Sequence, residues 1–187
     1  MVKRPLCSKR PLCSLTTPTL RGKTETVGSV FEAVGGVQGL LRLAGAWHER
    51  VMADEIVSHA FSLGFHPEHT ERLAAYWAEA LGGPALYSET MGKETAVVRT
   101  HSGNGPHEEM DERAIACFDE ALNDVGFTAG DPVRQVLYDY FTWATNGPMA
   151  RYHDSADDVP DDLEIPKWSW DGLRPDTYVP IRGSIGR

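Results

Sequence analysis

The chain has 187 residues, of which 41% are hydrophobic, and this length and composition suit a single domain with one core and flexible ends. No apolar run approaches the roughly 18 residues that span a bilayer, so we expect a soluble protein. The formal net charge of −9 argues against nucleic acid as a partner. The three cysteines have neither a disulfide-framework spacing nor a zinc-site spacing.

Residues 1–28 are predicted to be a disordered basic tail. Residues 3–14 read Lys-Arg-Pro-Leu-Cys-Ser twice in tandem, and the first 23 residues include no acidic side chain. Such a segment buries too little apolar surface to offset the entropy of ordering it. It lacks the apolar stretch of a secretory signal, so the expected compartment is the cytoplasm. A basic anchor for an anionic surface is the alternative interpretation of this tail.

Residues 29–153 are predicted to form an all-α domain, because no segment alternates apolar and polar residues with a period of two. Ser29 and Glu32 have the spacing of a helix capping box, and Asp131-Pro132 is typical of a helix start. Gly147-Pro148 should kink or interrupt the last helix. The apolar stripes place the main helices at about 37–53, 67–80, 108–125 and 132–144, with a helical turn between Asp54 and Phe61.

Residues 154–187 are predicted to form an acidic, proline-rich C-terminal extension. The segment includes two tryptophans, Trp168 and Trp170, which are unusual in a solvated tail. We therefore expect the extension to fold back and to dock one of these indoles on the helical body.

Three histidines lie on or beside apolar faces of the predicted elements: His48, His69 and His101. His101 follows a Gly-Gly-Pro turn and a short connecting element, and it precedes an irregular Ser-Gly-Asn-Gly-Pro loop. A buried imidazole needs a partner on each ring nitrogen, which an iron atom or a backbone carbonyl can provide. Any one of these histidines could be an ordinary core residue, but three around one cavity favour a binding site.

At this point the sequence resembles the truncated hemoglobins, and within them the second group. The stretches that carry the resemblance are Phe31-Glu-Ala-Val-Gly-Gly36, Gly82-Gly-Pro-Ala-Leu-Tyr-Ser-Glu89, His101, and Arg113-Ala-Ile-Ala-Cys117. The resemblance covers about Ser29 to His153.

The resemblance implies a two-over-two helical sandwich that binds heme b, with His101 as the proximal iron ligand. Phe61 would pack against the porphyrin, and Tyr76 is among the residues expected to form the apolar walls of the site. The resemblance also implies a ligand pocket lined by His48, His69 and Leu73, and heme propionates met by Tyr87, Ser88 and Arg99.

Two departures from the family pattern concern the ligand pocket. His48 stands where the family usually has tyrosine, and Ala114 stands where it usually has tryptophan, so very slow dioxygen release is not implied. His69 occupies a distal position that is often small in this group, and it offers an imidazole N–H to a ligand with partial negative charge. Ala114 leaves volume that tryptophan would fill.

The leading hypothesis is a heme protein that reversibly binds dioxygen, nitric oxide or carbon monoxide, for oxygen transport or for redox chemistry such as nitric oxide dioxygenation or peroxide reduction. The sequence has no flavin or nicotinamide fingerprint, so catalysis would require an external reductant. One alternative is a bis-histidyl electron-transfer or sensor protein with His69 or His48 as the sixth ligand. Another is a heme-free helical interaction module that docks through its acidic extension. The oligomeric state stays open, and a di-iron bundle is disfavoured because the sequence has no Glu-x-x-His pairs.

Overall fold

The computed structural model describes residues 28–175, and the predicted basic tail falls almost entirely outside them. Apart from one two-stranded hairpin, the regular elements of the described chain are all helices, which confirms the all-α prediction. Among these residues, no helix combines the length and the apolar composition that crossing a membrane requires. The helices are α1 (Val30–Ala33), α2 (Gly36–Ala53), η1 (Val57–Phe61), α3 (His69–Ala80), α4 (Leu86–Thr90), α5 (Glu94–Thr100), α6 (Glu108–Asp124), α7 (Pro132–Ala144), η2 (Thr145–Met149) and η3 (Ala156–Asp158).

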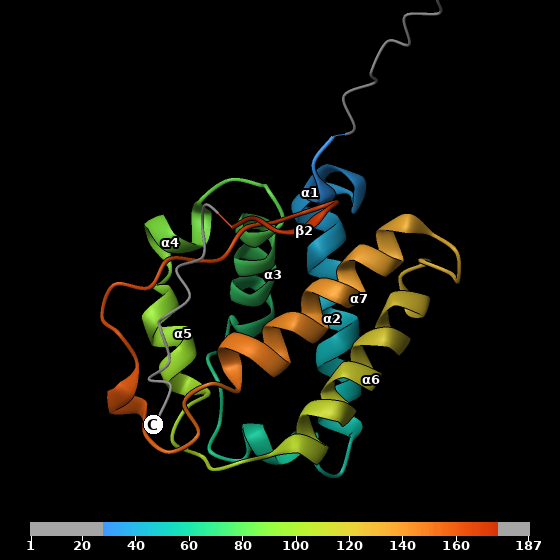
Figure 1. Ribbon diagram of the computed structural model, residues 1–187. Coiled ribbons are helices and arrows are strands. Elements are labelled where there is room, and N and C mark those ends of the chain that lie inside the picture. The colour runs from blue at the N-terminus through green and yellow to red at the C-terminus, as the bar shows by residue number, and fades with distance from the viewer. Residues whose placement is uncertain (1–27, 176–187) are drawn as a thin grey trace, which may run out of the picture.

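Two pairs of long helices form the body of the domain (Figure 1). Helix α2 packs against α3 and also against α6, which in turn packs against α7. Helices α2 and α3 form one pair and run in opposite directions, and so do α6 and α7 in the other pair, as the colour gradient in Figure 1 shows. This arrangement is the predicted two-over-two sandwich. Its core is formed by apolar side chains that include Leu40, Leu43, Trp77, Phe118, Leu122, Leu137 and Phe141.

The predicted helix starts are confirmed where the signal is local. The Ser29 side chain accepts a hydrogen bond from the Glu32 backbone N–H, and the Glu32 carboxylate accepts one from the Ser29 N–H, which completes the capping box of α1. The Asp131 carboxylate accepts a bond from Val133 N at the start of α7. At the other end of α7, the chain continues as a π-helical turn that contains Pro148, so the predicted interruption is confirmed.

The Gly-Gly-Pro turn after α3 brings the chain close to α1. A Cβ atom on Gly83 would lie 2.8 Å from both the Ala78 carbonyl oxygen and the Phe31 ring, so only glycine fits there. The chain then forms two short helices, α4 and α5, where the sequence suggested only a connecting element. Helix α3 begins at His69, slightly later than the expected start at Pro67.

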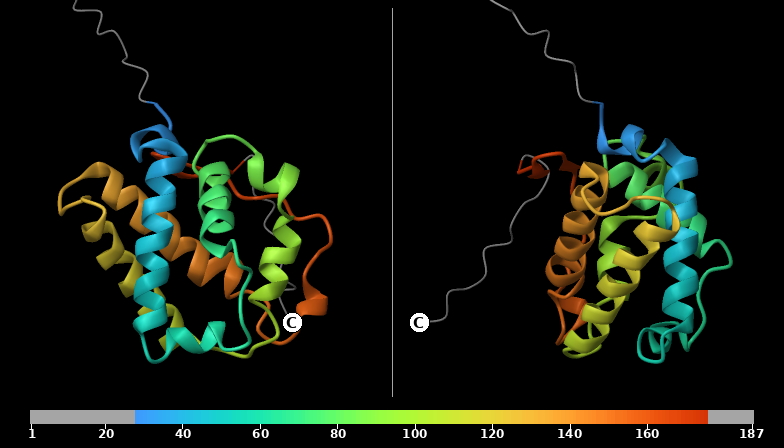
Figure 2. Two further views of the ribbon diagram at one scale, coloured as in Figure 1. Left: turned by 180° about the vertical axis from the view of Figure 1, so that it is seen from behind. Right: turned by 90° about the vertical axis from the view of Figure 1, so that its right-hand side faces the viewer.

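The residues after α7, 150–175, cross the outside of the helical body (Figures 1 and 2). They run along α5 and then over the end of α3 to a minimal hairpin of β1 (Trp168–Ser169) and β2 (Gly172–Leu173). Trp168 is 9% exposed and packs edge to face on Tyr140 of α7. The prediction that a tryptophan of the extension docks on the body is therefore confirmed.

Candidate functional site

His101 lies directly after α5, where it caps the C-terminal end of that helix. Its Nδ1 lies 2.8 Å from the carbonyl oxygen of Val97. A carbonyl can only accept, so Nδ1 carries the proton and donates, and the lone pair remains on Nε2. Solvent reaches the His101 side chain, yet protein surrounds it closely enough that desolvation lowers the pKa of its imidazole. The residue thus presents a neutral ring with one nitrogen able to bind a metal.

An aromatic cluster, consisting of His48, Phe61, Phe65 and His69, forms where α2, η1 and the start of α3 meet. The ring centroids of His48 and His69 are 5.1 Å apart. Phe61 lies 5.5 Å from His48 and 5.4 Å from His69, in both cases nearly perpendicular to the imidazole. The Nδ1 atoms of both histidines are buried and have no hydrogen-bond partner among the described residues. A buried Nδ1 without a partner is costly in a core, and two of them on neighbouring imidazoles are typical of a ligand site.

Electrostatics connect this aromatic cluster to His101. Desolvation lowers the pKa of His69, and positive charge on His48 and on His101 lowers it further. Positive charge on the exposed His66 acts in the same direction, so all three imidazoles lie within electrostatic range of His69. The lowered pKa keeps His69 neutral near pH 7, so that its ring has one N–H to donate.

Leu73 and Ala114, which were also expected to line the ligand pocket, lie outside the aromatic cluster. Leu73, one turn after His69 on α3, is half-buried and packs against the hydrophobic core. Ala114 is half-buried on α6, and its carbonyl oxygen accepts a hydrogen bond from Trp47 Nε1 at 3.2 Å. Trp47 in turn contacts Trp77 and Phe141 edge to face. The Trp47 indole of α2 therefore lies beside Ala114, the position at which the resemblance to the truncated hemoglobins implies a tryptophan.

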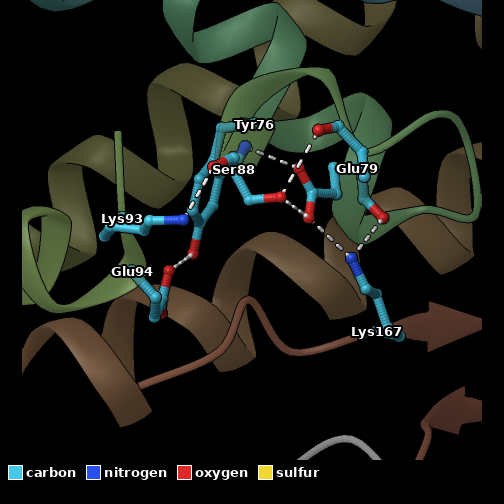
Figure 3. Close-up of polar contacts among 7 residues, drawn as sticks. Tyr76, Glu79, Ser88, Lys93, Glu94 and Lys167 are labelled. Atoms are coloured by element: carbon cyan, nitrogen blue, oxygen red, sulfur yellow. Dashed lines mark hydrogen bonds and ion pairs between the residues drawn. The ribbon is translucent and has the colours of Figure 1, made fainter. Parts of the chain in front are cut away.

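Tyr76 and Ser88 lie in a separate polar cluster, defined by Tyr76, Glu79, Ser88, Glu94 and Lys167 (Figure 3). The Tyr76 hydroxyl donates to Glu94 Oε2 at 2.8 Å. The Ser88 hydroxyl and backbone N–H both donate to the Glu79 carboxylate, at 2.8 and 2.9 Å. Lys167, from the residues after α7, donates to the same carboxylate at 3.0 Å. A cavity of about 340 Å³ borders this polar cluster.

Burial shifts the ionisation of the polar cluster. Desolvation raises the pKa of Glu94 to about 7, although the bond from Tyr76 opposes the shift. Burial also raises the pKa of the Tyr76 hydroxyl. Desolvation would raise the pKa of Glu79 as well, but hydrogen bonds from Ser88 and Lys167 outweigh it and lower that pKa overall. The polar cluster is therefore a set of mutually satisfied groups with one carboxyl that ionises near neutrality.

Tyr87 and Arg99, expected at the heme propionates, have protein partners in this structure. The Tyr87 ring lies edge to face on Tyr76, with centroids 5.3 Å apart. The Arg99 guanidinium donates to the Val159 carbonyl at 3.1 Å and to the Asp161 carboxylate at 2.7 Å. The structure thus brings the rings of His48, Phe61 and His69 into contact. Tyr76, Tyr87, Ser88 and Arg99 have other partners in the protein.

Sequence reasoning missed four residues of these two sites. Phe65 has an i, i+4 spacing from Phe61 that could have marked it, but its position after Gly64 suggested a loop. Glu79, Glu94 and Lys167 are charged residues in which no local pattern indicates burial. Their partners are up to 88 residues away in the sequence, so only the fold identifies them.

The side chains that could bind a metal here fit a metal ion that a cofactor already coordinates. Within residues 28–175, no three His, Cys, Asp or Glu side chains are placed to hold a bare metal ion. A single available imidazole nitrogen, such as Nε2 of His101, is what the iron of a heme requires from one side. The aromatic rings of Phe61 and Phe65 and the unpartnered imidazoles of His48 and His69 suit the other side, where a small polar ligand would lie.

The family model for bacterial-like globins matches residues 29–146. No curated protein is similar enough in sequence to count as a match.

Several solved structures share the fold. A thermostable hemoglobin from the actinobacterium Thermobifida fusca is 27% identical, with a TM-score of 0.55, and the match covers 66% of this chain and 98% of that one. A hemoglobin from the thermophilic phototrophic bacterium Chloroflexus aurantiacus is 26% identical, with a TM-score of 0.56 and coverage of 66% and 99%. The group II truncated hemoglobin from Bacillus anthracis, at 22% identity and a TM-score of 0.56, covers 68% of this chain and 95% of its own, and it supports the fold alone.

Proposed function

Because the chain belongs to the bacterial-like globin family and has the fold of a truncated hemoglobin, we propose that it binds heme through His101 and a diatomic ligand beside His48 and His69. Residues 29–153 would form the heme-binding domain, and the residues that follow would be an extension of it. Dioxygen, nitric oxide and carbon monoxide are the ligands that such a site would take.

The observation that carries this proposal is the hydrogen bond from His101 Nδ1 to the Val97 carbonyl. This bond fixes both the tautomer and the direction of the ring, so that Nε2 is presented as a ligand without any further rearrangement. Heme would supply an iron with one exchangeable coordination position, and its identity as heme b is part of the proposal.

The chain's own residues would act on the bound ligand from the other side. His69 and His48 can each donate an N–H to an oxygen that carries partial negative charge, a bond worth roughly 1.5–3 kcal/mol. Phe61 and Phe65 place aromatic rings against His48 and His69 in that region. The retention of the ligand would therefore depend on the two imidazoles, while turnover of nitric oxide or peroxide would need an external reductant.

Absorption spectra test the iron ligand. We expect the wild type, reconstituted with heme, to show an intense Soret band and a carbon monoxide complex in the ferrous state. His101→Ala should lose the proximal bond, with weaker heme retention and an altered ferrous spectrum. His59→Ala changes an exposed histidine of η1 and serves as the control. A wild type without a Soret band, or a His101→Ala spectrum identical to the wild type, would refute the proposal.

A second candidate function is favoured by the buried, unpartnered Nδ1 atoms of His48 and His69. If one of these rings bound the iron, the protein would be a bis-histidyl electron-transfer or sensor protein. Its ferrous form would then be six-coordinate and low-spin before any gas is added. Alanine at the histidine that binds the iron, His69→Ala or His48→Ala, would abolish that spectrum, whereas alanine at the other would not. A five-coordinate ferrous wild type rules this candidate out.

A further inference from the structure

The helix that presents His101 is short and is held from outside by the residues that follow α7. Helix α5 has only seven residues, Glu94–Thr100. A helix of this length is unstable by itself, so its position must come from tertiary contacts. On the inner side Val98 is 1% exposed, which anchors one face of the helix in the core.

The outer side of α5 is covered by residues 152–163, here called the C-terminal clamp. The Thr95 hydroxyl, in the first turn of α5, donates to the Pro160 carbonyl at 2.9 Å and accepts from the Leu163 N–H at 3.1 Å. Thr95 is 6% exposed, so both bonds are shielded from water. In the last turn, Arg99 reaches the Val159 carbonyl and Asp161.

The C-terminal clamp also holds the loop that follows His101. The Gly103 N–H donates to the Tyr152 carbonyl at 2.9 Å, and the Gly105 N–H donates to the His153 carbonyl at 3.1 Å. A Cβ atom on Gly103 would lie 3.3 Å from Ala156 N, which shows how closely the two segments approach. The chain is therefore tied to the clamp both before and after His101.

We propose that the C-terminal clamp fixes the orientation of His101, and that Thr95 is the positioning residue through which it acts. The clamp lies beyond the 29–146 stretch that matches the globin family, so this control would come from residues outside that match rather than from the shared fold. Because His101 is proposed to bind iron, the inference rests on the proposed function. In physical terms, the hydrogen bonds on the outer side of α5 would set the angle and the stiffness of the bond between His101 Nε2 and the iron.

Three threonine variants test the proposal. Thr95→Val keeps the shape of the side chain but removes the hydroxyl that bonds to Pro160 and Leu163. Thr95→Ser keeps that hydroxyl and should restore wild-type behaviour. Thr100→Val is the matched control, because the Thr100 hydroxyl is on the same helix but is exposed and bonds only within the helix, to the Ala96 carbonyl.

Two measurements are made on the full chain. In the heme-loaded ferrous protein, resonance Raman spectroscopy should show a shifted and broadened iron–histidine stretching band for Thr95→Val only. In the protein without heme, hydrogen exchange should be about tenfold faster in Thr95→Val at the amides of His101 and Ser102, which bond back into α5. The proposal is overturned if Thr95→Val matches the wild type in both measurements, or if Thr100→Val changes as much.

The two proposals fail in different ways. If the wild type does not bind heme, the proposed function is wrong, whereas unchanged Thr95→Val spectra in a heme-loaded protein overturn only the role of the clamp. Should Thr95→Val not fold, Val159→Ala replaces it, because Val159 is a clamp residue that is 2% exposed and its truncation loosens the same contact. Val159→Ala is expected to change the Raman band in the same direction.

Discussion

At the scale of single residues, Glu94 combines deep burial with an ionisable group. Its side chain is 3% exposed, and it faces the Tyr76 hydroxyl, the Glu79 carboxylate and the Lys167 ammonium. Burial raises the pKa of Glu94 from 4.5 to about 7. The folded protein therefore holds a proton that the unfolded chain releases between these two pH values, so the free energy of unfolding falls as the pH rises through this window.

We predict that Glu94→Gln removes this loss of stability. The amide oxygen of glutamine can still accept the bond from Tyr76, but it cannot ionise. Because one pKa unit corresponds to about 1.4 kcal/mol, the variant should be more stable than the wild type by up to roughly 2–3 kcal/mol at pH 8 and nearly equal at pH 4.5. Urea denaturation at the two pH values measures this, with the exposed Glu164→Gln as control. An equal effect of Glu94→Gln at both values would contradict the prediction.

The sequence could indicate His48, His69 and His101 because each lies beside an apolar stripe or a glycine-rich turn. It could not indicate Glu79, because that residue lies between two alanines of α3 and looks like any charged position of a helix. Its burial depends on Ser88 and Lys167, which lie on other segments. Partners that are remote in the sequence leave no local pattern.

At the scale of elements, the contact between α1 and α2 depends on a glycine inside a helix. A Cβ atom on Gly39 would clash with the Val34 carbonyl oxygen at the end of α1. Gly45, two turns later in α2, has open space at the same position. The two glycines therefore have different roles, although alanine favours helix formation at both.

We predict opposite effects for Gly39→Ala and Gly45→Ala. Gly45→Ala should stabilise the protein by about 0.5–1 kcal/mol, because alanine loses less backbone entropy in a helix. Gly39→Ala should destabilise it by roughly 1–3 kcal/mol, because α1 must move away from α2. Thermal unfolding followed by circular dichroism compares the two variants. If both raised the melting temperature, the close approach of α1 to α2 would be wrong.

The helices that sequence patterns located well are those with local signals. The capping box marks α1, and Asp131-Pro132 marks α7, because each depends on residues within one turn. Helices α4 and α5 were not expected, since both are too short for a periodic stripe and depend on packing by distant segments. The same reason explains why the covering of α5 by residues 152–163 could not be foreseen.

At the scale of the whole molecule, the residues after α7 act as part of the core. Trp168 packs against Tyr140 and Trp143 of α7, with ring centroids 5.8 and 5.3 Å apart. Trp170 is less buried, and its indole N–H donates to the Gly28 carbonyl at 2.6 Å. The tryptophan pair in an acidic stretch was sufficient to predict docking, but not which indole is buried or which helix it meets.

We predict that Trp168→Ala and Trp170→Ala differ clearly in stability. Trp168→Ala should cost about 3–5 kcal/mol, because it empties a filled position against α7. Trp170→Ala should cost about 1 kcal/mol, mainly for one hydrogen bond at the surface. Guanidinium denaturation of the full chain measures both. A Trp168→Ala protein as stable as the wild type would mean that the extension is not part of the folded body.

The bond from Trp170 to the Gly28 carbonyl joins residues 142 positions apart. During synthesis, α1 is made well before Trp170 is added, because about 140 residues lie between them. At about 5–20 residues per second, roughly 7–30 seconds separate the two. The helices α2, α3, α6 and α7 are all made before Trp170, so the sandwich can begin to pack before Trp170 closes over the start of α1.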